Sequence, residues 1–341
     1  MRFDRRMAMA GLAVGAMMPA VAKALPQRLP PRLRRGDMVG LVAPAGLIGD
    51  AFDLALVTET VAAMGLVPKV GPSVLSRDGY LAGSDAARAA DVNAMYADPV
   101  VKAVFAVRGG WGCARILPLL DWGLIARNPK LLVGFSDVTA LHMGFAARAG
   151  FSTIHGPNAG GDWGKLSWDS FRAVAFEGGT PLYRNPAGDD DRLVQDAGRT
   201  RTLRGGRASG RLLGGNLTVL TALMGTPWLP DFTGAILFLE DVEEAEYRID
   251  RMMTQLALGG VLGKVAGVVF GKCTRCISQG AGLGNFTLTE VLQRHLAELG
   301  VPVFEGLMVG HVANQFSLPI GVRAEMDADA GTLRLLEPAV G

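Results

Sequence analysis

A short apolar run that leads directly into a serine and then into a helical pattern is the most constraining feature of this sequence. Leu131–Phe135 contains apolar residues and one glycine, Ser136 follows, and helical spacing begins immediately after it. A buried strand followed at once by a helix is typical of open α/β sheets, which bind ligands at the carboxyl ends of their strands. The sequence therefore predicts that Ser136 lies at the ligand-binding edge of a sheet.

Strand-like and helix-like segments alternate through the rest of the chain. Strands are expected at residues 38–43, 101–107, 235–239 and 265–270, and helices at 52–64, 249–258 and 288–299. This alternation predicts a mostly parallel sheet with helices on its faces. The periodicity fails between residues 161 and 206, and 341 residues are many for one domain. We therefore expect two α/β domains, at 36–160 and 207–341, joined by an inter-domain crossing at 161–206.

The N-terminus has the three-part layout of a secretory signal peptide. A basic start with the pair Arg5-Arg6 precedes an apolar run at residues 7–20, and Ala22-Lys23-Ala24 places small residues where a signal peptidase reads. We expect a signal peptide at residues 1–24, cleaved near Ala24, and a periplasmic protein. The arginine pair hints at twin-arginine export, although the general route stays open. The alternative is a frayed, nonfunctional N-terminus on a cytoplasmic protein.

Removing the leader changes the charge of the chain. Residues 1–24 hold four basic residues and one acidic residue, a net charge of +3, whereas the whole chain carries +2, so the remainder is close to −1. The proline- and arginine-rich stretch at 25–35 is expected to be a linker. Nucleic-acid binding requires a basic face, so no nucleic-acid partner is expected. No later segment has the apolar length of a transmembrane helix, so no stable membrane insertion is expected after the leader is removed.

The three cysteines do not predict a metal site. Cys273 and Cys276 have the spacing of a redox motif or of half a zinc site, but no second pair or nearby histidine completes four ligands. We expect no metal and no cofactor, and whether these two cysteines form a disulfide stays open. The glycine-rich set Gly280–Asn285 lacks the strand-to-helix placement of a dinucleotide loop and is interpreted as a flexible loop.

Two strand ends carry candidate groups for hydrolysis. Gly134 and Ser136 match the start of the nucleophile elbow Gly-x-Ser-x-Gly, but Val138 stands at its last position. Serine is also a favoured helix N-cap, so local sequence leaves nucleophile and cap as equal alternatives. The turn Arg108–Gly112 follows another apolar run and could supply half of an oxyanion hole, with Trp111 as a substrate wall, or could simply be a tight turn.

The acidic residues and the histidines are weaker sequence signals for a catalytic site. Glu240 and Asp241 follow the apolar run 237–239, where a carboxylate can orient a histidine, although an acid at a helix N-terminus or in a solvated turn is the more frequent outcome. Of the four histidines, His295 lies in a charged helical stretch and is expected at the surface. A lone histidine is more often structural than catalytic, so local sequence does not choose among the other three, which are His142, His155 and His311.

Eight groups of short stretches occur in order between residues 36 and 323: Gly36-Asp37-Met38-Val39 with Ala43-Pro44-Ala45, Tyr80–Asp85 with Arg88–Asp91, Val107–Gly112, Asn128-Pro129-Lys130 with Gly134–Asp137, His155-Gly156-Pro157, Leu213–Leu217, Leu239-Glu240-Asp241 with Tyr247–Arg251, and Gly310-His311. In this combination they resemble the LD-carboxypeptidase family of serine peptidases, which includes the microcin-immunity peptidases. The resemblance implies a flavodoxin-like N-terminal domain and a smaller C-terminal α/β domain of β/β/α type, with the active site at their interface.

The resemblance also implies roles for single residues. Ser136 would be the nucleophile, His311 the base and Glu240 the group that orients the base, while the backbone amides of Gly110 and Asp137 would form the oxyanion hole. Substrate contacts are expected from three further residues: Arg108, Trp111 and Asn216. Two departures from the family pattern matter. Many members carry tyrosine where Trp111 stands, and many are cytoplasmic and lack a leader.

Three functions follow as alternatives. The first is a homodimeric serine carboxypeptidase that cuts the L,D-peptide bond of murein tetrapeptides and releases the terminal D-alanine. The second is an immunity-type peptidase or amidase that acts on a peptide-nucleotide or another amide. The third is a murein-peptide binding protein without catalysis, against which the presence of Ser136, Glu240 and His311 argues.

Overall fold

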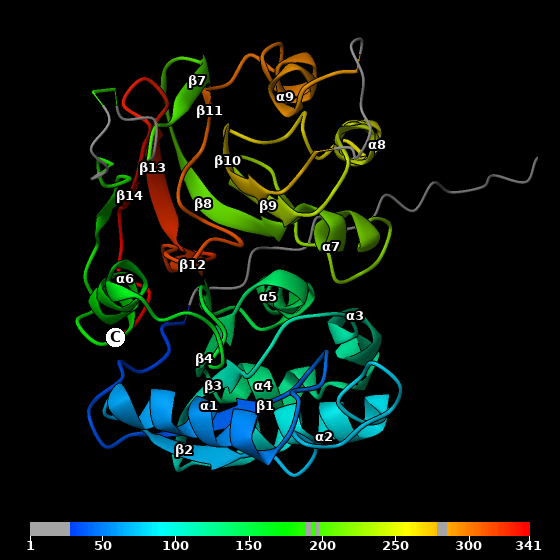
Figure 1. Ribbon diagram of the computed structural model, residues 1–341, viewed down its shortest axis with the longest axis vertical. Coiled ribbons are helices and arrows are strands. Elements are labelled where there is room, and N and C mark those ends of the chain that lie inside the picture. Colours follow the sequence, from blue (N-terminus) through cyan, green and yellow to red (C-terminus); the bar gives the residue numbers. More distant parts are fainter. Residues whose placement is uncertain (1–27, 189–192, 195–197, 278–284) are drawn as a thin grey trace, which may run out of the picture.

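The computed structural model describes residues 28–188, 193–194, 198–277 and 285–341 (Figure 1). The expected signal peptide and most of the glycine set Gly280–Asn285 lie outside the described residues. Within those ranges, no helix is both long enough and apolar enough to cross a membrane. The chain forms two α/β lobes, which lie one above the other in Figure 1, each built on its own sheet.

The first lobe is a six-stranded sheet in the order β12-β5-β4-β3-β1-β2. All neighbouring strands run parallel except β12, which pairs antiparallel with β5. Its central strands are apolar and buried along almost their whole length, as expected when helices cover both faces of a parallel sheet. The elements of this lobe are β1 (Met38–Val42), α1 (Ala51–Ala63), β2 (Val67–Val70), α2 (Asp85–Ala97), β3 (Val101–Ala106), α3 (Cys113–Ile116), η1 (Leu117–Leu119), α4 (Trp122–Arg127), β4 (Leu131–Gly134), η2 (Ser136–Val138), α5 (Thr139–Arg148), β5 (Thr153–His155) and the late strand β12 (Leu318–Ile320).

The second lobe is an eight-stranded sheet in the order β6-β14-β13-β8-β9-β10-β11-β7. The four strands from β8 to β11 are parallel, and the outer strands are antiparallel to them or to each other. The remaining elements are α6 (Lys165–Ala175), β6 (Leu182–Tyr183), β7 (Arg201–Arg204), β8 (Arg207–Asn216), α7 (Leu217–Ala222), β9 (Ile236–Val242), α8 (Glu246–Leu258), β10 (Gly267–Thr274), α9 (Leu288–Leu296), β11 (Val303–Glu305), β13 (Arg323–Asp327) and β14 (Thr332–Leu335).

The predicted two-domain α/β architecture is confirmed, and two details differ from expectation. The second domain was expected to be the smaller one, yet its sheet has eight strands against six. The crossing at 161–206 contains helix α6 and the edge strands β6 and β7. These two strands have only two and four residues, and β7 is mostly exposed. The sequence of β7 is polar and the two residues of β6 are too few to alternate, so neither edge strand carries a periodic hydrophobic signal. Helix α6 buries Phe171 and Val174, and the expectation that no periodic element lies in this stretch was wrong there.

The chain end returns to the first lobe after it has built the second. Strand β12 pairs with β5, so that Leu318 lies opposite His155. The Ser152 hydroxyl then donates a hydrogen bond to the Ala339 carbonyl at 2.5 Å. The two lobes are therefore linked by the C-terminal segment as well as by the crossing at 161–206.

A close backbone contact joins the lobes beside the end of β4. The Asn216 amide, at the end of β8, donates to the Thr139 hydroxyl at the start of α5, at 2.9 Å. Gly215 has a φ of 142°, and a Cβ atom there would lie 2.4 Å from the Thr139 hydroxyl oxygen. Only glycine permits both this backbone conformation and this approach. The contact fixes the carboxyl ends of β4 and β8 against each other.

Candidate active site

Ser136 occupies a strained turn between a strand and a helix. Its φ is 64°, a left-handed conformation that is costly for a residue with a side chain. Phe135, and not Ser136, is the N-cap of η2, and no side chain caps that short helix. The N-cap alternative is therefore not what the structure shows. A strained serine at the carboxyl end of a buried strand is the arrangement of a nucleophile elbow.

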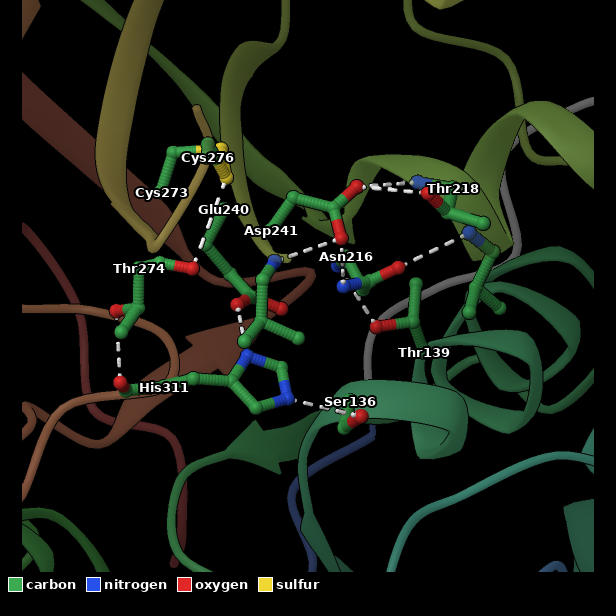
Figure 2. Close-up of polar contacts among 12 residues, drawn as sticks. Ser136, Thr139, Asn216, Thr218, Glu240, Asp241, Cys273, Thr274, Cys276 and His311 are labelled. Atoms are coloured by element: carbon green, nitrogen blue, oxygen red, sulfur yellow. Dashed lines mark hydrogen bonds and ion pairs between the residues drawn. A yellow bond between two sulfur atoms is a disulfide. The ribbon is translucent and has the colours of Figure 1, made fainter. Parts of the chain in front are cut away.

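His311 and Glu240 reach Ser136 from the second lobe. His311 Nε2 lies 3.1 Å from the Ser136 hydroxyl oxygen, and His311 Nδ1 lies 2.8 Å from Glu240 Oε2, as Figure 2 shows. Glu240 extends from β9 and is fully buried, whereas the His311 side chain keeps 21% of its surface exposed. The structure thus brings together the three residues proposed as nucleophile, base and orienting group.

The direction of these hydrogen bonds determines what the group can do. A carboxylate only accepts, so Glu240 fixes the proton of His311 on Nδ1 and leaves the lone pair of Nε2 directed at Ser136. The serine hydroxyl then donates to Nε2 and can transfer its proton there during attack. The arrangement is competent for nucleophilic catalysis by serine.

Glycines make room for this arrangement on both sides. A Cβ atom on Gly109 would lie 2.9 Å from the Ser136 Cβ, so the turn after β3 packs directly against the serine. Gly310 has a φ of 111°, and a Cβ atom there would lie 2.7 Å from Glu240 Oε2. The residue before His311 is thus glycine for both conformational and steric reasons.

The expected oxyanion donors lie next to the serine. Gly110 adjoins Gly109 and has a φ of 114°, and Asp137 follows Ser136 in the chain. Within the described residues, neither amide donates to a backbone carbonyl, so both remain available to a substrate. The Asp137 carboxylate accepts a hydrogen bond from the Cys113 amide at 2.7 Å, which ties the serine turn to the glycine-rich turn. Burial raises the pKa of Asp137.

Arg108 and Trp111 border an open cavity of about 580 Å³ beside Gly110. The Arg108 guanidinium donates to the Leu47 carbonyl at 2.9 Å, and Trp111 is 45% exposed. The residues lining the cavity are Gly46, Leu47, Tyr80, Arg108, Gly110 and Trp111. The cavity can therefore receive the part of a substrate that extends beyond the oxyanion donors.

Asn216 has a structural task that sequence reasoning missed. Its side-chain oxygen accepts from the Val219 amide at 3.1 Å as the N-cap of α7, and its side-chain nitrogen donates to Asp241 at 2.9 Å (Figure 2). Asn216 is only 4% exposed, and its side chain joins β8 to α7 and β9 within the second lobe, while its backbone amide makes the contact with Thr139 of the first lobe. Burial, which is the larger cause, and the neighbouring Glu240 together raise the pKa of Asp241 to about 6. Thr139 and Asp241 carry no sequence signal that separates them from ordinary cap or turn residues.

The other three histidines do not face Ser136 as a base would. His142 is buried between the Gly134 carbonyl and the Thr153 hydroxyl, each 2.8 Å away, and burial lowers its pKa to about 4. His155 is buried behind Phe135, whose ring also packs against His311. His295 was expected at the surface, but its side chain is only 17% exposed because it binds Asp250 between α8 and α9.

The cysteine question that the sequence left open has an answer in the structure. Cys273 and Cys276 form a disulfide at the end of β10, and Cys113 is a buried free thiol. Within the described ranges, no three histidine, cysteine, aspartate or glutamate side chains gather as metal ligands would.

Comparison with known proteins places this geometry in a family. Profiles of the LD-carboxypeptidase N-terminal and C-terminal domains match residues 39–156 and 209–326. A putative carboxypeptidase of Streptomyces coelicolor is 42% identical over 319 residues, which are 91% of this chain and 97% of the relative. The murein tetrapeptide carboxypeptidase of Pseudomonas aeruginosa is 33% identical over 296 residues, covering 85% of this chain and 93% of the relative.

A solved structure shares the fold. The microcin C7 self-immunity protein MccF in complex with aspartyl sulfamoyl adenosine superposes with a TM-score of 0.82 at 25% identity, covering 92% of this chain and all of that chain. The family profiles match both lobes, and the shared fold covers 92% of this chain. This chain is therefore a serine carboxypeptidase that belongs to the LD-carboxypeptidase family.

Proposed function

We propose that this protein hydrolyses the L,D-peptide bond of murein tetrapeptides and releases the terminal D-alanine. The observation that carries the proposal is the hydrogen-bonded series from Ser136 through His311 to Glu240 at the lobe interface. A relative named murein tetrapeptide carboxypeptidase supports the substrate class. No step requires a metal or a cofactor.

The proposed reaction uses these residues as nucleophile, base and orienting group. The Ser136 oxygen attacks the carbonyl carbon of the scissile bond while its proton passes to His311 Nε2, 3.1 Å away. The amides of Gly110 and Asp137 stabilise the negative oxygen of the tetrahedral intermediate. The proton on His311 then moves to the leaving nitrogen, D-alanine departs, and an acyl-enzyme remains. Water, deprotonated by His311, hydrolyses the acyl-enzyme and restores Ser136.

Glu240 supports both proton transfers. Its buried carboxylate accepts from Nδ1 and stabilises the imidazolium that forms when Nε2 takes a proton. Low exposure strengthens this electrostatic contribution, because water does not screen it. Glu240 therefore orients the base without reacting itself.

The same proposal includes export and assembly. We place the mature protein in the periplasm as a homodimer, after cleavage near Ala24. The Cys273–Cys276 disulfide supports this location, because disulfides persist in oxidising compartments and are rare in the cytosol. Size-exclusion chromatography with light scattering measures the assembly state.

A peptide-nucleotide is the second candidate substrate class. The likeness to MccF bound to aspartyl sulfamoyl adenosine supports an amidase acting on a peptide-nucleotide. The 45% exposed Trp111 at the cavity rim offers an aromatic face on which a base can stack. A binding protein without catalysis is the remaining alternative, and it leaves the Ser136–His311 contact without a purpose.

One experiment separates these functions. The purified protein is incubated with murein tri-, tetra- and pentapeptides and with an aminoacyl sulfamoyl adenosine, and products are identified by mass spectrometry. If the tetrapeptide is the only substrate cleaved, and it loses one D-alanine, the result supports the proposal. Cleavage of the nucleotide amide with intact tetrapeptide supports the immunity-type reaction. Binding of tetrapeptide with no product from any substrate would establish the binding protein. Ser136→Ala serves as the control for contaminating peptidases.

A further inference from the structure

The hydroxyl of Thr274 holds the backbone of the histidine that faces Ser136. Thr274 is the last residue of β10, and its Oγ1 donates to the His311 carbonyl at 2.7 Å (Figure 2). The residues are 37 positions apart in sequence, so this contact is made by the fold and not by local chain geometry. This hydrogen bond restrains the backbone of His311 directly, in addition to the bond between the His311 imidazole and Glu240.

The end of β10 holds a longer part of the His311 segment. The Lys272 amide donates to the Val309 carbonyl at 2.9 Å, two residues before His311. A Cβ atom on Gly271 would lie 2.6 Å from the same carbonyl oxygen, which shows how closely the two segments approach. The backbone at 309–311 is thus attached to β10 at two points, one main-chain bond and one side-chain bond.

The same strand end is joined to the strand that carries Glu240. Thr274 lies opposite Val242 in the parallel pairing of β10 with β9, and Cys273 lies opposite Asp241. The Thr274 carbonyl also accepts from the Glu243 amide at 2.9 Å. Thr274 therefore connects the backbone after Glu240 with the backbone of His311.

The disulfide closes the chain around Thr274. Cys273 precedes it and Cys276 follows two positions later, and their bond holds these Cα atoms 5.4 Å apart. Between them, Arg275 has a φ of 57°, a left-handed conformation for a residue with a side chain. Such a conformation persists only where the surroundings enforce it, and here the disulfide encloses it. The exposed Arg275–Glu243 ion pair is a weak addition.

We propose that Thr274 is a positioning residue for His311 and that the Cys273–Cys276 disulfide keeps Thr274 in place, so that reduction of this disulfide slows the reaction at Ser136. The inference rests on the proposed roles of Ser136 and His311, but not on the identity of the substrate. A small dithiol supplies two electrons and two protons: the S–S bond breaks, Cys273 and Cys276 become thiols, and the dithiol becomes a cyclic disulfide.

Displacement of His311 affects the reaction more than the stability of the fold. The loss of one hydrogen bond between neutral groups has only a small effect on the stability of a fold. By contrast, misplacing a reacting group by about 1 Å can lower a rate by about 100-fold. A change that releases the His311 backbone should therefore reduce kcat while leaving substrate affinity and folding nearly unchanged.

A fluorophosphonate probe tests this independently of the substrate. The probe reacts with an activated serine, so its second-order rate constant at Ser136 reports how well His311 assists the hydroxyl. The comparison uses wild type, Thr274→Val, which removes the hydroxyl at nearly constant shape, and Thr274→Ser, which retains a donor. Thr202→Val is the matched control, because the Thr202 hydroxyl also donates to a carbonyl at 2.7 Å in the second lobe.

We expect Thr274→Val to lower the labelling rate about tenfold and Thr274→Ser to restore it to within about twofold of wild type. Thr202→Val should label like wild type. With any substrate that is cleaved, Thr274→Val should reduce kcat with KM changed by less than about twofold. Labelling of Thr274→Val at the wild-type rate, or equal losses in Thr274→Ser and Thr274→Val, would overturn the positioning role.

The disulfide is tested on the unaltered protein as well. Dithiothreitol should raise the thiols per chain from the single Cys113 to three and lower the labelling rate several-fold. It should have no further effect on the Cys273→Ser/Cys276→Ser double variant, which is slow from the start. An unchanged rate after complete reduction refutes the part of the inference that concerns the disulfide.

The outcomes distinguish this inference from the proposed function. If wild type labels rapidly but cleaves no murein peptide, the proposed substrate is wrong. The labelling rates of the variants then still decide whether Thr274 positions His311. Wild type that does not label at all refutes the activation of Ser136 and this inference with it. If Thr274→Val fails to fold, the labelling rate of wild type before and after reduction still decides whether the restraint around Thr274 affects Ser136.

Discussion

His311 Nε2 lies 3.1 Å from the Ser136 hydroxyl oxygen although 175 positions separate the two residues. Ser136 follows strand β4 of the first sheet, whereas His311 is held by strand β10 of the second sheet. The distance therefore depends on how the two lobes pack, and the Thr139–Asn216 hydrogen bond at 2.9 Å lies at that packing surface. The site is a property of the interface and not of either lobe alone.

Removal of the three reacting or orienting groups should have graded effects. We expect Ser136→Ala to abolish turnover and His311→Ala to be nearly as damaging, because such residues act as a unit. Glu240→Ala should retain roughly 10- to 100-fold more activity than Ser136→Ala, since Glu240 orients and does not react. Steady-state kinetics on the tetrapeptide measures these effects, with peptide binding and circular dichroism as controls.

A chelator should leave this activity unchanged, because no second cysteine pair or nearby histidine completes a set of four zinc ligands with Cys273 and Cys276. Full amidase activity in Ser136→Ala, or activity lost to chelation, would move the chemistry to another nucleophile or to a bound metal.

Gly310→Ala should inactivate the enzyme through Glu240. The added Cβ would lie 2.7 Å from Glu240 Oε2 and 2.8 Å from Glu240 Cβ, so either the carboxylate or the His311 backbone must move. We expect kcat to fall more than tenfold, by the sensitivity of catalysis to displacements of about 1 Å.

Gly300→Ala is the matched control for this substitution. Gly300 has a φ of 77°, so alanine is strained there too, but nothing lies within 4 Å of the added atom. Both variants should lose about 1 kcal/mol of stability from the backbone conformation, and only Gly310→Ala should lose activity. Equal activity of the two variants would show that Gly310 is needed only for its conformation.

Acid should destabilise the protein through His142. Burial lowers its folded pKa to about 4, below the ordinary value of 6.5. Its neutral form therefore contributes full stability above pH 6.5, and this contribution is lost as the pH falls toward 4. Between pH 7 and pH 5 we expect His142→Gln to lose about 2 kcal/mol less unfolding free energy than wild type.

Chemical denaturation at the two pH values measures this difference. Asp241, with its pKa raised to about 6, acts with the opposite sign, because its contribution is lost as the pH rises through 6. The comparison of two proteins that both contain Asp241 removes its effect. Parallel pH profiles for wild type and His142→Gln would show that His142 is not buried in its neutral form.

Export should depend on the arginine pair at the N-terminus. We expect the mature protein from the native host to begin near Leu25 and to occur in the periplasmic fraction, with Cys273 and Cys276 oxidised. Arg5→Lys/Arg6→Lys should cause precursor to accumulate if the twin-arginine route is used, since that route reads the arginine pair. N-terminal sequencing and thiol alkylation of fractionated cells check both points. Recovery of an uncleaved, cytosolic chain would refute export.

Local sequence determined those features whose physical cause is local. The apolar run Leu131–Phe135 specified a buried strand, and the abrupt change to helical spacing specified the turn that presents Ser136. Strand–helix alternation determined the α/β class, because each period reflects which face of one element is buried. The ordered short stretches determined the family. These features need no knowledge of what packs against them.

Tertiary structure alone decided the features that depend on distant partners. His142, His155 and His311 are nearly equivalent in local sequence, and only the family resemblance singled out His311. The packing of the lobes places His311 beside Ser136 and buries the other two. Asn216 was expected to contact the substrate, but the position of Asp241 commits its side chain to a structural hydrogen bond. The pairing of Cys273 with Cys276, and of β12 with the first sheet, likewise requires backbone segments to meet in space. Contacts of this kind are set by the summed packing of both lobes, and no single stretch of sequence contains that information.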